Sequence, residues 1–165
     1  MPKLAHTIYL TVIAGLSATV IWLGYYSPKD TVQETEAGPT ISSIAVLPFH
    51  VRGSDDSAKQ IAETIRSRLI TVLSNEPHLK VASRGDSRGF ADTTLSIRDI
   101  GDRLSVSTIL EGAVQEMQDR VRVTVQLIDV GTDEHVWSQV YERDIDDLDS
   151  IVADVERSIA TLSRD

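Results

Sequence analysis

Three consecutive stretches near the carboxyl end, residues 107–117, 120–130 and 134–144, alternate between apolar and polar side chains. The middle stretch, RVRVTVQLIDV, is the clearest case. In a strand it would place Val121, Val123, Val125 and Leu127 on one face and Arg122, Thr124 and Gln126 on the other. Only Gln118 and Asp119, and then residues 131–133, separate the stretches, which is the spacing of hairpins. The sequence therefore predicts an antiparallel three-stranded meander.

Helical periodicity surrounds this meander. Apolar residues recur at intervals of three and four in residues 57–73, 96–104 and 148–162, and Ser57 with Gln60 and Ser96 with Asp99 form capping-box patterns. Residues 42–49 and 79–83 are typical of short strands, and residues 84–94 of a loop. The predicted order is β-α-β-α-β-β-β-α. This is an α+β (mixed α/β) fold in which helices cover one sheet face, the one with the valines.

A charge-free segment, residues 7–26, precedes the globular part. As a helix it spans about 30 Å, the thickness of a bilayer core. Trp22, Tyr25 and Tyr26 gather at its far end, where aromatic rings favour the headgroup region and anchor a helix. A cleaved signal peptide is the alternative, although its apolar region is usually shorter, about 7–15 residues. We expect an uncleaved transmembrane helix.

The domain organisation follows from this helix. Residues 1–6 form a short cytoplasmic tail, residues 7–26 the membrane helix, residues 27–40 a polar linker with two prolines, and residues 41–165 one domain. The amino terminus and Lys3 favour an amino terminus inside the cell. The sequence thus predicts a single-pass protein of the inner (cytoplasmic) membrane with a periplasmic soluble domain.

Composition removes several classes of function. The net charge is −9 with a pI of about 4.8, so nucleic acid is not an expected partner, and Arg120 and Arg122 alone do not make a basic ribbon. The absence of cysteine excludes disulfides, thiolate nucleophiles and cysteine-based zinc sites. No cofactor is expected, because no glycine-rich phosphate loop occurs.

The remaining polar clusters have simple explanations. Asp144, Asp146, Asp147 and Asp149 lack the spacing and the glycine of a calcium loop and are typical of acids near a helix start. The four histidines, His6, His50, His78 and His135, lack the spacing of metal ligands. Glu111, Glu116 and Glu142 are candidates for paired acids, although solvated sheet charges are the better explanation. Trp137 and Tyr141 share one strand face, either in the core or exposed as binding anchors.

Several segments together resemble a known family. SIAVLPF (43–49), the Pro-x-Leu-x-Val step (77–81), DIGDRLSVSTILEGAV (99–114) and DRVRVTVQLIDVGTDEHVWSQVYERD (119–144) are similar to the TolB amino-terminal-like domain, a bacterial group that includes FlgO-type flagellar proteins. The resemblance covers about residues 42–164. It differs at the first hairpin turn, where the usual Gly-Asp is Gln118 and Asp119. It implies a non-catalytic periplasmic module and supplies no catalytic residue. Such domains often accompany a cyclase or a winged-helix DNA-binding domain.

These observations lead to three hypotheses about function. The first is a membrane-anchored periplasmic adaptor that binds other envelope proteins, with Arg122, Thr124 and Gln126 contributing to the docking surface. The second is a periplasmic sensor or ligand-binding module of a cyclase- or transcription-regulator-associated signalling system. The third, a hydrolase, lacks any nucleophile motif. The sequence leaves open whether the protein forms homo-oligomers.

Overall fold

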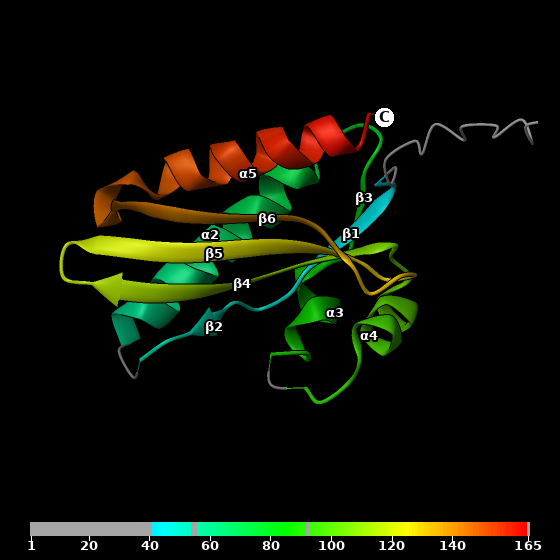
Figure 1. The fold of residues 1–165 in the computed structure, drawn as a ribbon, viewed down its shortest axis with the longest axis horizontal. Coiled ribbons are helices and arrows are strands. Elements are labelled where there is room, and N and C mark those ends of the chain that lie inside the picture. Colours follow the sequence, from blue (N-terminus) through cyan, green and yellow to red (C-terminus); the bar gives the residue numbers. More distant parts are fainter. Residues whose placement is uncertain (1–40, 54–55, 92, 165) are drawn as a thin grey trace, which may run out of the picture. The chain divides into compact units, whose positions relative to one another are not determined.

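The computed structural model describes residues 41–53, 56–91 and 93–164 (Figure 1). The predicted cytoplasmic tail, the transmembrane helix with Trp22, Tyr25 and Tyr26, and the linker lie outside these residues. Within the described ranges, no helix combines the length and the apolar character needed to cross a membrane. The membrane anchor therefore stays a prediction.

A six-stranded mixed sheet forms the centre of the described structure. Its strands are β1 (Ser43–Val46), β2 (His50–Val51), β3 (Lys80–Val81), β4 (Thr108–Met117), β5 (Arg120–Asp129) and β6 (His135–Asp144). The order is β3-β1-β4-β5-β6, and the short β2 pairs with β4. β1 runs parallel to β3 and β4, whereas β4, β5 and β6 are antiparallel neighbours. The predicted meander is therefore confirmed.

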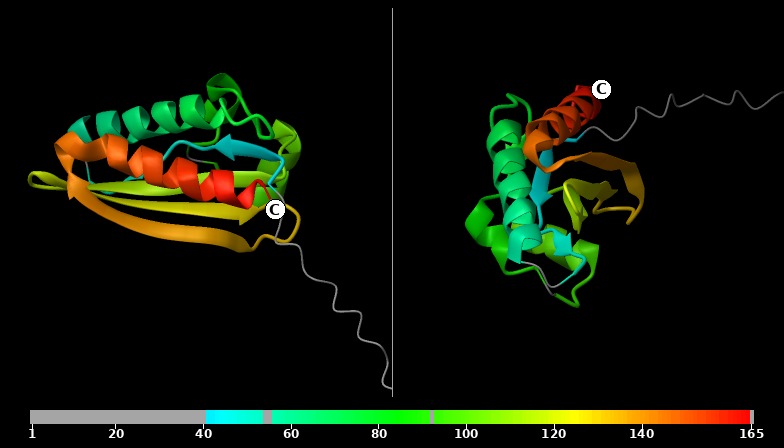
Figure 2. Two further views of the ribbon diagram at one scale, coloured as in Figure 1. Left: turned by 90° about the horizontal axis from the view of Figure 1, so that it is seen from above. Right: turned by 90° about the vertical axis from the view of Figure 1, so that its left-hand side faces the viewer.

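Helices lie on both faces of this sheet. α2 (Asp56–Leu73) and α5 (Leu148–Leu162), which the 3₁₀ turn η1 (Ile145–Asp147) precedes, pack side by side on one face (Figure 2). α3 (Arg84–Arg88) and α4 (Ile97–Leu104) follow β3, and α4 packs on the opposite side of β1 and β4. The prediction that helices cover one face only is wrong for this half of the sheet. The reason is that β1 is apolar on both sides, as buried parallel strands usually are.

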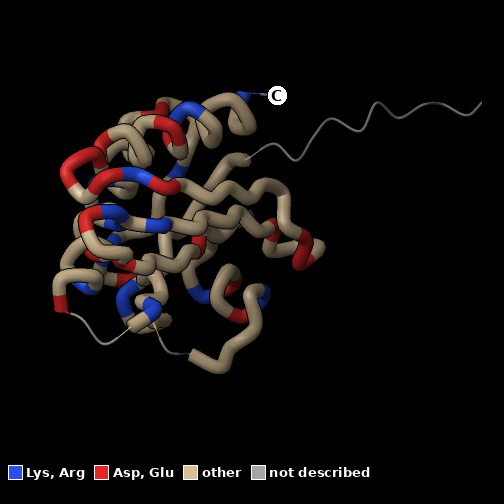
Figure 3. Tube along the Cα trace, turned by 60° about the vertical axis from the view of Figure 1, so that its left-hand side comes forward, with Lys and Arg blue, Asp and Glu red and all other residues tan. Residues whose placement is uncertain are grey.

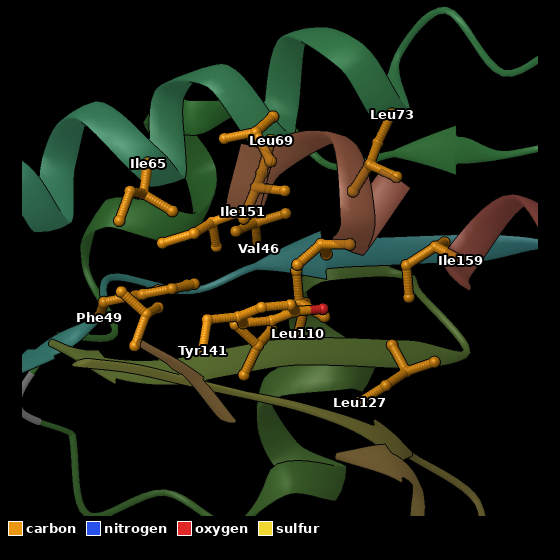
Figure 4. Packing of buried hydrophobic residues seen from close by; sticks show 14 of the residues in the cluster. Val46, Phe49, Ile65, Leu69, Leu73, Leu110, Leu127, Tyr141, Ile151 and Ile159 are labelled. Carbon is orange, nitrogen blue, oxygen red and sulfur yellow. The ribbon is translucent and has the colours of Figure 1, made fainter. Parts of the chain in front are cut away.

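The main core lies between the sheet and the α2–α5 layer. Val121, Val123, Val125 and Leu127 are each 0% exposed, as their alternation predicts. Figure 4 shows side chains of α2 and α5 pointing at the sheet, among them Ile65, Leu69 and Ile151. A second cluster fills the other face between α4 and the sheet and contains Ala45, Leu47, Ile100, Val106, Ile109 and Val130.

Serine caps define two of the shorter helices. Ser96 caps α4 as predicted, since its Oγ accepts a hydrogen bond from the Asp99 backbone N–H at 3.2 Å and donates to the Asp99 carboxylate at 2.7 Å. These bonds lower the pKa of Asp99. The predicted loop at residues 84–94 is wrong in its first half, because Ser83 and Asp86 cap α3 in the same way. The sequence contains this Ser-x-x-Asp capping pattern. The two glycines nearby, Gly85 and Gly89, favoured the prediction of a loop.

Of two further local predictions, one is wrong and one is correct. The capping box at Ser57 is wrong, because α2 begins at Asp56 and the Ser57 hydroxyl donates instead to the Glu116 carboxylate at 2.5 Å. The turn at Gln118 is correct, and Gln118 adopts a φ of 58°. This left-handed conformation suits glycine, which explains why the resembling family uses glycine there.

Candidate interaction surface

The meander has an open face on the side away from α2 and α5. Since successive strand residues point to opposite sides, the residues between the buried valines of β5 point to this face. Arg122 is exposed there, and Thr124 and Gln126 are half-buried. The strand register places Arg122 between Gln115 of β4 and Glu142 of β6. The predicted partner-binding side chains therefore share one surface, and their role in binding stays a prediction.

Charges of both signs lie together at the end of this face nearest the β4–β5 turn (Figure 3). Arg122 donates to Glu142 Oε1 through Nε at 2.7 Å and through Nη2 at 2.5 Å. Because these side chains are 46% and 40% exposed, the pair contributes only about 0–1 kcal/mol to stability. The pair holds the Arg122 and Glu142 side chains in a defined orientation on this face.

The hollow beside Arg122 on the open face is too small for a small molecule. A hollow lined by Arg52, Ala113, Val114, Gln115, Arg122 and Thr124 has a volume of about 10 Å³. A cavity needs roughly 10–15 Å³ to hold one water. A metabolite therefore does not fit this hollow.

The opposite side of β6 settles the question about the two aromatic residues. Tyr141 is 5% exposed and lies in the core, and Trp137 is half-buried against the same cluster. Burial raises the pKa of the Tyr141 phenol, and the nearby Asp154 carboxylate raises it further. Core packing is thus the correct interpretation of both residues.

The place where doubly wound sheets usually bind ligands is filled in this protein. β1 continues through α2 to β3, and β3 continues through α3 and α4 to β4 on the other side of β1. Such a switch in direction normally opens a crevice at the carboxyl ends of the two strands. Here β2 continues along β4 past the end of β1, and the Arg66 side chain, 1% exposed, lies against that end on the side of α3. Arg66 donates to the Val46 carbonyl at 3.2 Å, to the Arg84 carbonyl at 3.2 Å and to Ser87 Oγ at 2.8 Å.

The hollows differ in size and lining, and one of about 310 Å³ lies between α2 and α5 beside Val72, Asp149 and Val152. One of about 530 Å³ is lined entirely by polar and charged side chains, namely Gln60, Glu63, Thr64, Ser67, Arg68 and Arg84. Another, of about 110 Å³, is lined by Phe90, Leu95 and Ile100 together with His50 and Glu111, and polar atoms make up most of its surface. Ligand pockets are usually about 300–1,000 Å³ and mostly apolar. The 530 Å³ hollow has the volume of a ligand pocket, although its lining residues are polar or charged, and the 110 Å³ hollow is too small.

The candidate acids do not come together as a catalytic pair. Glu111 and Glu116 are five residues apart on β4, so they point to opposite sides of the sheet. Glu142 is paired with Arg122, and Glu116 accepts the Ser57 hydroxyl. The prediction of paired acids did not take into account that residues five apart on a strand lie on opposite faces of the sheet.

The aspartates around η1 contact local partners. Asp144 lies 3.7 Å from Arg120, the Asp147 carboxylate accepts a hydrogen bond from Ser150, and Asp149 pairs with Arg68 of α2. Across the part of the chain that the structure describes, no group of three or more His, Asp or Glu side chains is arranged to hold a metal ion. These aspartates thus lie at the start of α5, where acids complement the helix dipole.

The fold defines a class of protein, a small α/β domain of the kind seen in TolB. TolB from Acinetobacter baumannii matches with a TM-score of 0.53 and 16% identity over 74% of this chain and 28% of that chain. Lipoprotein GNA1162 from Neisseria meningitidis matches with a TM-score of 0.54 and 16% identity over 72% of this chain and 96% of that chain. At these identities the likeness shows the fold alone.

Sequence comparison identifies the family. A model described as "HilA/YgeH-like transcriptional regulator, second domain" matches residues 40–162, and the chain belongs to this family. The chain is also 34% identical over 152 residues to "Putative adenylate cyclase 3" of Rhizobium meliloti (strain 1021), a match that covers 87% of this chain and 26% of that protein. The chain thus spans about a quarter of that relative's length. The TolB resemblance is confirmed as a fold, and the FlgO-type relationship stays a prediction.

Proposed function

We propose that residues 41–165 form a non-catalytic interaction domain that binds a protein partner through the open face of the meander. The observation that carries this proposal is the shape of that face. Arg122, Thr124 and Gln126 lie on a surface whose hollow has only about 10 Å³. The surface therefore suits a protein of complementary charge and shape better than a metabolite.

The relatives support a role in recognition. The family is described as a domain of transcriptional regulators, and a similar sequence occurs in a protein named as a cyclase. DNA binding and nucleotide cyclisation share no chemistry. A domain common to both contexts would supply binding or assembly, and a different part of each protein would carry out its specific reaction.

The proposed location is the bacterial envelope, with residues 7–26 as a single membrane helix and the domain in the periplasm. The charge-free segment supports an anchor, and a lipoprotein has the same fold. An anchored protein stays in the membrane pellet after alkaline carbonate extraction, and full-length release would contradict the anchor. Protease added to spheroplasts should digest residues 41–165, and protection of this region would reverse the orientation.

The docking face is tested by exchanging the charges of its ion pair. The single substitution Arg122→Glu would place two carboxylates directly opposite each other, which destabilises a sheet by about 0.2–1 kcal/mol. The double substitution Arg122→Glu with Glu142→Arg keeps an ion pair and reverses its direction. With a photo-crosslinker at Gln126, this variant should lose the partner captured in membranes while its melting temperature stays nearly unchanged.

A crosslinker at Thr71, exposed on the outer side of α2, is the matched control. It should capture the same partner poorly in every variant. Capture at full yield from Gln126 in the charge-exchanged protein would show that the face is only solvated and that the partner docks elsewhere.

The alternative is a sensor or ligand-binding module of a signalling protein, which the regulator family and the cyclase relative favour. Its site would be the pocket beside Leu95, of about 110 Å³. The substitution Leu95→Phe fills this pocket. A small ligand that raises the melting temperature of the native protein and not of this variant would favour the sensor.

A further inference from the structure

β6 is an edge strand whose outer side is uncovered in the middle. It is the last strand of the sheet order and pairs with β5 alone. Ser138, Gln139 and Val140 are all exposed. Gln139 points to the same side as the core residues Trp137 and Tyr141, so its exposure shows that the middle of β6 extends beyond the helical layer.

The backbone on this edge has a defined hydrogen-bonding pattern. The Ile145 N–H donates to the Asp119 carbonyl at 3.0 Å. In an antiparallel pair the bonded residues alternate. Arg143, Tyr141, Gln139 and Trp137 therefore exchange their backbone hydrogen bonds with β5. Glu142, Val140 and Ser138 direct their N–H and C=O groups outwards. The Glu142 carbonyl accepts hydrogen bonds from Arg120 at 3.2 Å and from Arg143 at 3.0 Å, so the backbone groups of Val140 and Ser138 are the ones open for pairing.

The edge also lacks the usual protection against pairing. Edge strands are commonly guarded by lysine, proline, charged side chains or bulges. The register shift that marks a bulge lies at the His135 end, before Trp137. The segment from Trp137 to Tyr141, WSQVY, contains no charge and no proline. Val140 is 51% exposed, the one large hydrophobic side chain in the described ranges that is classed as exposed.

We propose that two copies of this chain pair antiparallel through their β6 edges, with Val140 at the twofold axis. In this register Val140 lies opposite Val140 of the second copy, and the outward backbone groups of the two Val140 residues meet as a hydrogen-bonded pair. For Glu142 and Ser138 to pair as well, the Arg120 and Arg143 side chains must release the Glu142 carbonyl. Glu142 then lies opposite Ser138, and Arg143 lies opposite Trp137. The pairing joins the two sheets into one and places both open faces on the same side.

Self-complementarity identifies the occupant as a second copy. A register centred on Glu142 would bring two carboxylates together, which destabilises paired strands. Centring on Val140 avoids every like-charge pair and covers the exposed valine with its own counterpart. This inference concerns the strand edge and does not depend on partner binding at the open face.

The test uses single-cysteine variants of the full chain, which has no cysteine of its own. Hydrogen-bonded antiparallel residues have Cα atoms about 5.5 Å apart, within the range of about 4.4–6.8 Å that a disulfide spans. Val140→Cys should therefore form a disulfide dimer when membranes are oxidised with copper phenanthroline. Ser138→Cys and Glu142→Cys, co-expressed with different tags, should join to each other.

Ser138→Cys alone is the matched control. Its copies would lie about 13 Å apart along the strands, at about 3.4 Å per residue, so it should stay monomeric. A monomeric Val140→Cys, an equal dimer yield from Ser138→Cys, or a Val140→Cys adduct with a different protein would each overturn the proposal.

A non-covalent measurement complements the crosslinking. In detergent, light scattering should give the mass of two chains for the native protein and of one chain for Val140→Lys. The melting temperature of the Val140→Lys monomer should match that of native protein diluted until its dimers dissociate, because the substituted side chain is exposed. Equal masses for the two proteins would also refute the dimer.

Discussion

Replacing Arg66 with alanine tests how much this buried side chain stabilises the packing of α2 against β1 and α3. The guanidinium is 1% exposed and joins three elements, since it donates to the Val46 carbonyl of β1 and to Arg84 and Ser87 of α3. It also lies 3.4 Å from Glu63 on its own helix. Removing it would leave these acceptors without their donor.

The magnitude follows from the fully buried contacts. The hydrogen bonds to the Val46 carbonyl and to Ser87 Oγ are buried, and each bond to a charged donor is worth about 1.5–3 kcal/mol. The lower value applies, because the variant no longer has to desolvate a charge. Arg66→Ala should therefore lower the free energy of unfolding by about 3 kcal/mol, a large share of a typical 5–15 kcal/mol.

Urea unfolding of the native protein, Arg66→Ala, Ser87→Ala and the double variant measures this loss and its coupling. Ser87→Ala removes one of the bonds and should cost less. The cycle should give a coupling energy of about 0.5–3 kcal/mol. A loss below about 1 kcal/mol for Arg66→Ala, or strictly additive effects, would show that the arginine is not the tie between α2, β1 and α3.

Three further predictions concern the meander. Gly112→Ala should cost about 1–3 kcal/mol in urea unfolding, because a Cβ there would lie 2.5 Å from the Thr124 carbonyl oxygen and 2.8 Å from the Phe49 ring; an unchanged midpoint would contradict the close approach. Gln118→Gly should raise stability by about 0.5–1 kcal/mol by relieving its φ of 58°, and a loss would show that the Gln118 side chain stabilises the turn. The raised pKa of Tyr141 means that its contribution is complete below about pH 10, the unfolded pKa, and is lost as the pH rises through the folded pKa. Urea midpoints should therefore fall more steeply above pH 10 for the native protein than for Tyr141→Phe, and parallel curves would refute this.

Much of the meander could be predicted from the sequence, because strand alternation is a local signal. The core face of β5 follows from the valine spacing alone. The second layer of helix was missed, since nothing local shows that β1 is covered on both sides. Its two-sided apolar sequence was the available sign.

Arg66 was missed for a different reason. Charged residues are usually exposed, and its role depends on carbonyl groups of β1 and α3 that are distant in sequence. One signal was present, because Arg66 is four residues after Ala62 and three before Leu69, both on the buried side of α2. Helical spacing therefore placed it among core positions.

The sequence predicted which side chains lie on the open face, but it did not predict which residues they contact. Alternation assigns Arg122 to this face, but its pairing with Glu142 depends on the β5–β6 register, in which Arg122 lies opposite Glu142. Register depends on turn length and on bulges, and the shift between Leu127 and Ile128 is not visible in the sequence.

The crevice and the meander together constrain where recognition can occur. β2 and the buried Arg66 close the carboxyl end of β1, a place where doubly wound sheets often bind ligands, so a ligand there would have to displace a buried guanidinium from its hydrogen bonds. The meander extends beyond this closed end and offers an open face around Arg122 and a free backbone edge at Val140. Both features suit contact with other protein chains. A protein that pairs through β6 would present two copies of the open face on one side. A partner with two linked binding sites would then bind with higher overall affinity, because its second site binds at a high effective concentration.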